Sequence, residues 1–189
     1  MLNQLMFLFW EQGYDRTSHD DMRDITGLSG SSLYHAFGDK PAIFDAVLER
    51  YHVLSEPSSN ALTSGTEGAA DLLRFVDWVE AHVRGDGTPA GCLMVSTTAA
   101  RRGRTPAVQS RTRAYHSRLR DALAAALTRA TDRGELRAGD AQVRAVLLLS
   151  VNWGVMIAAV DEPGSPESLQ MLRGLRELIE SWACTARPA

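Results

Sequence analysis

The chain has 189 residues, of which 44% are hydrophobic and 23% charged, and a formal net charge of −3. This length permits a sizeable core in one domain or two small ones, and the composition is that of an ordinary globular protein. The two cysteines lack a Cys-x-x-Cys spacing, which argues against a disulfide-rich secreted protein. No basic region and cleavage site mark a signal peptide, so we expect a cytoplasmic protein.

The sequence contains no motif typical of an enzyme or a metalloprotein. There is no Gly-x-Ser-x-Gly, phosphate-binding glycine loop, His-Glu-x-x-His or compelling carboxylate pair, so we expect neither catalysis nor a metal or other cofactor. The most apolar stretch, residues 143–160, contains Arg144, Ser150 and Asn152, and we expect it to be a buried helix with no role in a membrane.

Hydrophobic residues recur at helical spacing along almost the whole chain, without the alternation of a strand. The sequence therefore predicts an all-α protein of about nine helices, near residues 2–12, 18–26, 30–37, 40–54, 67–84, 90–102, 106–133, 140–160 and 166–184. Residues 55–66 are poor in hydrophobic residues and predict a linker. We therefore expect two domains, one at 1–54 and the other at 55–189.

Residues 17–44 predict two short helices joined by a tight turn and followed at once by a third helix. Ser18 and Asp21 have the spacing of a capping box at the start of the first helix. Gly27 suits the left-handed conformation of the turn, and Ser29 can cap the second helix. This layout is that of a helix-turn-helix module, which reads DNA through its second helix.

The same region resembles the DNA-binding domain of the TetR/AcrR family in the order and spacing of its residues. The resemblance is carried by Gly13, Tyr14, Thr17, Ser18, Asp24, Ile25, Gly27, Leu28, Ser29, Ser32, Leu33, Tyr34, His35, Phe37 and Lys40. Residues 91–95 also resemble a segment found in some of these regulators. The resemblance implies a C-terminal helical domain that binds a ligand and dimerises, and a regulator of transcription that is most often a repressor.

A DNA contact is expected for Thr17, Ser18, Ser29, Gly30, Ser31, Ser32, Tyr34, His35 and Lys40. The resemblance implies that Lys40 contacts a phosphate, and we expect Thr17, Ser18 and Tyr34 to do the same. Residues 1–52 hold four cations against eight acids, an unusual balance for a domain that approaches phosphates. We expect either weak DNA binding or a native gene product that begins upstream of Met1, and we favour the second interpretation.

Bulky apolar residues and a few polar ones could converge on a cavity between the helices of the C-terminal domain. The candidates are Phe75, Trp78, His82, Cys92, Met94, Tyr115, His116, Leu119, Asn152, Trp153 and Met156. For each residue alone, core packing is the simpler role, whereas the group predicts a site for a small apolar effector. His116 or Asn152 would supply its polar contact. A role for Cys92 in sensing oxidants or electrophiles is the less favoured alternative, because no cation flanks it.

Residues 143–160 are apolar around almost the whole helix, and such a helix has to be covered on every side. The following helix carries an apolar stripe along one face. We expect these two helices to pair with their copies in a homodimer, while packing inside one chain is the alternative. The expected interface comprises Val143, Leu147, Gly154, Ala158, Leu172, Leu175, Ile179 and Trp182.

No acidic residue lies between Asp86 and Asp121, whereas seven arginines do. We expect this run to form a solvated surface, or else to contact the acidic DNA-binding domain or an acidic ligand. The sequence as a whole predicts a homodimer that binds a double-stranded DNA operator and is released by a small apolar molecule. The alternative is an all-α small-molecule-binding protein with a weak or vestigial DNA-binding head.

Overall fold

The computed structural model describes residues 1–85, 88–100, 102–103 and 105–184, without the side chains of 57–59 and 161. Within these residues every extended regular element is a helix, and one isolated β-bridge joins Leu136 to Ala183. The helices are α1 (Leu2–Arg16), α2 (His19–Thr26), α3 (Gly30–Phe37), α4 (Lys40–Ser64), α5 (Ala69–Val83), α6 (Leu93–Ala99), α7 (Pro106–Asp132), α8 (Ala141–Asp161) and α9 (Pro166–Ser181). The prediction of an all-α fold is confirmed.

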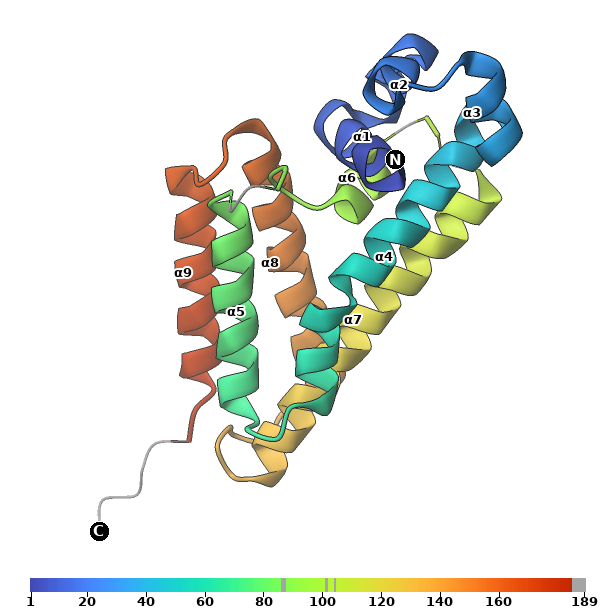
Figure 1. Ribbon diagram of the computed structural model, residues 1–189. Helices are drawn as coiled ribbons and strands as arrows, with labels where there is room; N and C mark the ends of the chain where they lie inside the picture. Colours follow the sequence, from blue (N-terminus) through green and yellow to red (C-terminus); the bar gives the residue numbers. More distant parts are fainter. Residues whose placement is uncertain (86–87, 101, 104, 185–189) are drawn as a thin grey trace.

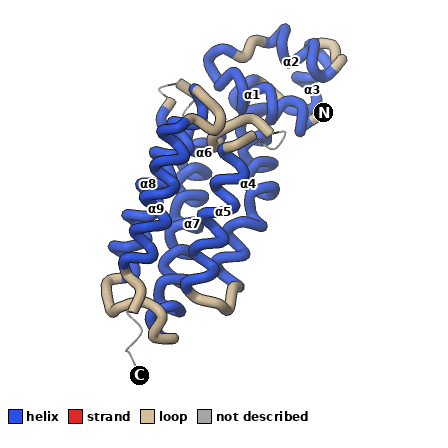
Figure 2. Tube along the Cα trace, turned by 90° about the vertical axis from the view of Figure 1, so that its left-hand side faces the viewer, coloured by secondary structure: helices blue, strands red, loops and turns tan. Residues whose placement is uncertain are grey.

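The helices form a small head and a larger bundle. Figure 1 shows α1, α2 and α3 grouped at one end, while α5, α8 and α9 stand side by side in the bundle. The long helices α4 and α7 lie against each other, and α4 leads directly from the head into the bundle. In the view of Figure 2 the molecule is elongated and the head lies at one end of it.

Local signals fix the helices of the head. Ser18 and Asp21 form the predicted capping box at α2, with Ser18 N donating to Asp21 at 2.7 Å and Asp21 N donating to Ser18 at 3.0 Å. Gly27 ends α2 with φ of 68°, a conformation that glycine adopts at little cost. The side chains of Ser29 and Asp39 cap α3 and α4. The turn between α2 and α3 is therefore set by residues within it.

The predicted linker at 55–66 is wrong for most of its length, because α4 continues to Ser64. Leu62 is 1% exposed and belongs to the core. Arg129 of α7 donates to the carbonyl oxygens of Leu62 and Thr63, which lie in the last turn of α4 and lack partners within the helix. Packing against α7 thus extends a helix whose local composition favours a loop.

The loop before α6 explains why glycine occupies position 91. Gly91 has φ of 79°, and a Cβ atom there would lie 2.6 Å from Cγ2 of Val160 and 2.7 Å from the carbonyl oxygen of Met156. Any other residue would therefore clash with α8. The helix that follows is shorter than predicted, from Leu93 to Ala99, and the left-handed conformation of residue 91 explains its later start.

Helix α9 packs inside its own chain. Leu172, Leu175 and Ile179 are only 1–2% exposed, and α9 contacts both α5 and α8. The prediction that these three residues contact a partner is therefore wrong, and the alternative of packing inside one chain is correct for them. Gly154 likewise faces Met171 of α9, whose sulfur would lie 3.7 Å from an added Cβ. Trp182 is half-buried, with the guanidinium of Arg144 4.7 Å above its ring.

Helix α8 buries one side against α7 and α9 and leaves an apolar surface on the other. This surface, the α8 face, consists of Val143, Val146, Leu147, Ile157 and Val160, which are 44–64% exposed. By length and composition α8 could also cross a bilayer, a test that core helices of soluble proteins pass equally well. Ala158 is half-buried beside this face.

Candidate functional site

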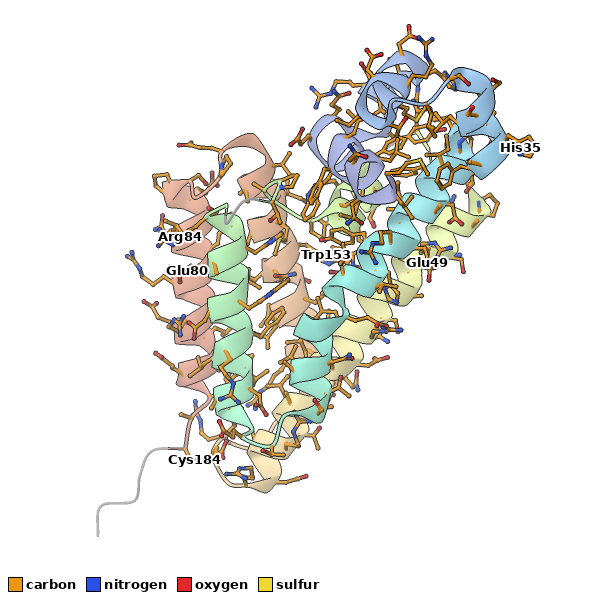
Figure 3. The ribbon with its side chains drawn as sticks, viewed as in Figure 1. His35, Glu49, Glu80, Arg84, Trp153 and Cys184 are labelled. Atoms are coloured by element: carbon orange, nitrogen blue, oxygen red, sulfur yellow. The ribbon has the colours of Figure 1, made fainter. Side chains whose placement is uncertain are left out.

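Helix α3 presents a small polar surface at the outer end of the head. Ser31, Ser32, Tyr34 and His35 are exposed, and Leu33 holds the opposite side of the helix in the core. Figure 3 shows His35 on the outer side of α3, directed away from the bundle. The ring of Tyr34 stacks on that of His19 of α2, with centroids 5.5 Å apart. Such a surface could enter a major groove, where short hydroxyl side chains approach base edges.

Some of the side chains that are expected to contact DNA already form hydrogen bonds within the head. The hydroxyl of Ser29 accepts from Ser32 N at 3.2 Å, while Gly30 is half-buried beside it. Thr17 is 1% exposed and donates its hydroxyl to the carbonyl of Gly13 at 2.8 Å. The prediction that the Thr17 side chain contacts a phosphate is therefore wrong in this conformation, because that side chain points into the fold.

Lys40 stands at the start of α4, beside the reading surface. Its ammonium lies 4.3 Å from the centroid of the Tyr14 ring, a cation–π contact that links α4 to α1. Burial lowers the pKa of Lys40, while Asp15 and Asp21 oppose that effect. The side chain is half-buried, so its stem is fixed near the surface that carries the exposed residues of α3.

Part of the acidity of α4 is neutralised by the arginines of α7. The guanidinium of Arg111 binds Asp45 through two hydrogen bonds of 2.9 and 3.0 Å and also contacts Glu49. Arg118 pairs with Glu56 of α4 at 2.6 Å. The interpretation that the basic run approaches acids of the DNA-binding region is therefore confirmed for Arg111. These pairs also join α4 to α7 along their length.

A cavity lies where α4, α5, α6, α7 and α8 meet; we call it the interior cavity. Its walls are Tyr51, Phe75, Trp78, His82, Cys92, Val95, Tyr115, Leu119, Asn152, Trp153 and Met156. Nine of the eleven predicted ligand residues are in this set. Figure 3 shows Trp153 on α8, on the side that faces α4 and α6. The free volume is only about 20 Å³, room for roughly one water molecule, so the walls are nearly closed.

Two predicted ligand residues lie elsewhere. Met94 is 0% exposed and fills the core without lining the cavity, so that prediction is wrong. His116 faces a separate groove between α7 and α8, because it lies on a different side of α7 from Tyr115 and Leu119. Conversely, Tyr51 and Val95 line the interior cavity and were not expected. Tyr51 falls in the apolar stripe of α4, which the sequence assigned to the head alone.

The polar groups of the interior cavity are mostly neutral donors and acceptors. The hydroxyl of Tyr51 lies 3.2 Å from the sulfur of Cys92, and burial raises the pKa of Tyr51 and Tyr115 well above that of an ordinary tyrosine. His82 donates through Nε2 to the carbonyl of Gly91 at 2.7 Å. Oδ1 of Asn152 is buried and has no hydrogen-bond partner within the part of the chain that the structure describes. A ligand donor would satisfy this acceptor.

The described residues contain no group of three or more His, Cys, Asp or Glu side chains that could hold a metal ion. The apolar walls offer shape and hydrophobic contact, and Asn152 offers one hydrogen bond. This arrangement suits the binding of an uncharged small molecule.

Comparisons with known proteins agree with both parts of the molecule. Residues 2–47 match the family model described as bacterial regulatory proteins, tetR family, and residues 68–170 match that of a tetracyclin repressor-like C-terminal domain. The chain is 30% identical over 97 residues to the HTH-type transcriptional repressor ComR of Escherichia coli K12. That match covers 50% of this chain and 46% of the relative, so it spans about half of each protein.

Solved structures share the fold over almost the whole chain. A TetR transcriptional regulator from Chloroflexus aurantiacus has a TM-score of 0.84 at 21% identity, covering 98% of this chain and 94% of its own. A cysteine mutant of the TetR-family regulator CifR, complexed with 26-base-pair operator DNA, has a TM-score of 0.81 at 22% identity, covering 96% and 94%. At these identities the likeness establishes the fold.

Proposed function

Because this chain belongs to the TetR family of bacterial regulatory proteins, we propose that it is a repressor released from operator DNA by a small apolar molecule. The family and the fold are those of transcriptional regulators. One observation carries the proposed mechanism: Tyr51, which lines the interior cavity, belongs to α4, the helix that begins directly after α3. A ligand in the cavity therefore acts on the helix that follows the reading surface.

The DNA-reading role is assigned to the exposed side of α3. Ser31, Ser32, Tyr34 and His35 would face the major groove, and Lys40 and Ser18 would contact phosphates at its edge. The CifR relative binds operator DNA with the same fold, which supports this placement. Because the reading side chains are short and mostly uncharged, phosphate contacts should supply much of the affinity.

The small volume of the interior cavity suggests how a ligand would release the protein from operator DNA. A ligand larger than one water has to push its walls apart, since about 20 Å³ is free. The wall contacts the head through Tyr51 and His82, whose rings lie 4.9 and 5.6 Å from that of Trp10 on α1. Expansion would move the head relative to the bundle. The ligand then favours the conformation with the wider cavity, and DNA favours the other.

A homodimer formed through the α8 face would place two heads on one operator. Five large apolar side chains exposed on one helix are unusual for a monomer and typical of an interface. Val143 and Leu147 of the expected interface belong to this face, whereas the α9 residues do not. Two-fold symmetry of the protein would match a pseudo-palindromic operator.

The alternative is a small-molecule-binding protein with a vestigial head, and one experiment separates the two functions. Footprinting on DNA that neighbours the gene should reveal one protected site, and a library of uncharged hydrophobic compounds should contain members that abolish the protection. Binding of such compounds without any DNA protection would support the alternative. Replacing Ser31 and His35 together by Ala should remove protection without changing ligand affinity, because both side chains are exposed on α3 and neither lines the interior cavity.

A further inference from the structure

A second cavity, the α7–α8 groove, opens on the surface between two neighbouring helices and has a volume of about 560 Å³. Its walls are Thr98, Gln109, Thr112, Arg113, His116, Ser117, Arg120, Val146, Leu149, Ser150 and Trp153. The volume lies within the range of small-molecule sites, and a two-ring compound would fit. Trp153 is the one residue that this groove shares with the interior cavity, so the two sites are adjacent and separately lined.

His116 provides the groove with a buried acceptor. It is 8% exposed, and its Nε2 lies 2.9 Å from the hydroxyl oxygen of Thr98. That hydroxyl lies 2.8 Å from the carbonyl oxygen of Met94, which can only accept, so its single hydrogen is committed there. The Thr98 oxygen therefore accepts from Nε2–H. Burial lowers the pKa of His116 to about 4, so the ring is neutral near pH 7 and Nδ1 carries no proton.

Nδ1 of His116 is buried and has no hydrogen-bond partner among the described residues. An unpaired buried acceptor is costly, and a ligand hydroxyl or N–H would satisfy it. Nε1 of Trp153 is a buried donor in the same situation. Both residues belong to the walls of the groove, and Trp153 also lines the interior cavity. Among the described residues these two ring nitrogens have no hydrogen-bond partner.

Arg113 adds a free positive charge to the groove. It is exposed and has no hydrogen bond or ion pair with any other part of the chain that the structure describes. The neighbouring Arg120 differs, because its Nη2 is held by Asp121 and Ser117, each at 2.9 Å. Arg113 and His116 are three residues apart on α7 and so project from the same side of the helix.

We propose that the α7–α8 groove binds an aromatic carboxylate that also carries a hydroxyl group. The carboxylate pairs with Arg113, and the hydroxyl donates to Nδ1 of His116. The aromatic body packs on Val146, Leu149 and Trp153, which form the apolar wall. A plain hydrocarbon would leave both Arg113 and the acceptor unpaired. This ligand class therefore differs from the uncharged one assigned to the interior cavity.

Binding of such a ligand to the groove does not depend on the proposed regulatory function. Only its role as an effector rests on that function. Val146 belongs to both the groove and the α8 face, so the groove opens beside the proposed dimer contact. A ligand bound there would touch the interface in a dimer. Binding and dimerisation would then be linked.

The test uses the full chain without DNA and three probes in isothermal titration calorimetry. The probes are 6-hydroxy-2-naphthoate, 2-naphthoate, which lacks the hydroxyl, and 2-naphthol, which lacks the carboxylate. The first should bind at least about tenfold more tightly than either analogue, because each analogue loses one hydrogen bond to a buried or charged group. Equal affinities for all three, or no binding of any, would overturn the proposal.

Two variants assign the contacts. Arg113→Gln should weaken both naphthoates about tenfold and leave 2-naphthol unchanged, and Arg173→Gln, at an exposed arginine of α9, is the matched control. His116→Phe keeps an aromatic ring but removes Nδ1, so it should erase the preference for the hydroxylated probe. Circular dichroism melting verifies that each variant folds.

Further variants distinguish this site from its neighbours. Asn152→Leu changes the interior cavity only and should leave the affinity for 6-hydroxy-2-naphthoate unchanged. If it abolishes binding, the probe occupies the interior cavity and the proposal is wrong. The proposal also fails if Arg113→Gln dissociates the dimer in sedimentation, since the groove is then a protein contact. Whether the protein binds operator DNA is measured in a separate assay. A negative result there would contradict the proposed function, but it would not affect the titration that tests the groove.

Discussion

The head and the bundle obtain their structures in different ways. In the head, a capping box, a left-handed glycine and a capping serine define α2 and α3 within a few positions of the sequence, and a capping aspartate starts α4. In the bundle, helix ends and neighbours depend on contacts between distant residues, such as Arg129 with the end of α4 and Arg111 with Asp45. Removing a local signal should therefore lower the free energy of unfolding only moderately. Removing a contact between distant residues should lower it more, because such a contact joins separate helices.

The buried carboxylate of Asp71 offers the strongest test of this difference. It is 4% exposed, accepts from the amides of Glu67 and Gly68 at 3.0 and 3.1 Å, and pairs with Arg74 and Arg129. Asp71→Ala should lower the free energy of unfolding by about 3 kcal/mol, because it leaves the amides of Glu67 and Gly68 unpaired and removes the carboxylate that Arg74 and Arg129 share. Chemical denaturation followed by circular dichroism measures this change.

The control for Asp71 is Asp77→Ala, on the same helix. Asp77 pairs with Arg176, but its side chain is 61% exposed. Exposed ion pairs contribute about 0–1 kcal/mol, so this variant should be close to the parent protein. Similar losses in both variants would mean that burial does not decide how much these two carboxylates contribute to stability.

The second test concerns the α8 face, which the bundle leaves uncovered. Leu147 is 44% exposed in one chain, so Leu147→Arg should hardly change the free energy of unfolding of the monomer. In a dimer the same change buries a charge and should weaken association by about 2 kcal/mol, roughly thirtyfold. Sedimentation velocity across a concentration series measures the association. Leu175→Arg is the contrasting variant, since Leu175 is 1% exposed and the change should unfold the chain.

The sequence predicts the head almost completely and the bundle only in part. Periodicity located the helices of both regions, because a helix stripe is a local pattern. It could not tell whether an apolar stripe is covered by the same chain or by a partner, and so α9 was assigned to the wrong contact. Composition also predicts a linker at 55–66, but α4 continues to Ser64, because it contacts α7, which lies more than 60 residues away in sequence.

The candidate cavity was predictable as a group of residues, whereas the details of its walls were not. Large apolar residues on four helices had to meet somewhere, which explains the agreement for Phe75, Leu119 and Met156. Which side of α7 each residue faces depends on the rotation of that helix in the bundle. That rotation separated His116 from Tyr115 and divided one predicted site into two cavities.

A third prediction tests the local signals of the head. Ser18→Ala removes the cap of α2 and should lower the free energy of unfolding by about 1 kcal/mol. Ser31→Ala changes an exposed serine of α3 that caps no helix, and it should leave stability within about 0.5 kcal/mol of the parent protein. Thermal melts of both variants suffice. A larger loss at Ser31 than at Ser18 would show that capping is not what fixes these short helices.

The smallest effect is expected at Lys40, where head and DNA would meet. If Lys40 contacts one phosphate, Lys40→Gln should reduce the slope of log affinity against log salt by about one and change stability little. Tyr14→Phe keeps the ring beneath the ammonium and should leave the slope unchanged. The measurement is fluorescence anisotropy with labelled operator DNA at several salt concentrations.

An unchanged slope in Lys40→Gln would give this lysine a different role. Its contact with Tyr14 fastens the start of α4 to α1, and Tyr14 in turn packs on Phe9 and Phe44, with ring centroids 6.3 and 4.9 Å away. In that case the variant should lower the melting temperature of the head and weaken DNA binding equally at all salt concentrations. The salt series thus separates a charge that meets phosphate from one that holds two helices together, which affinity at a single salt concentration cannot do.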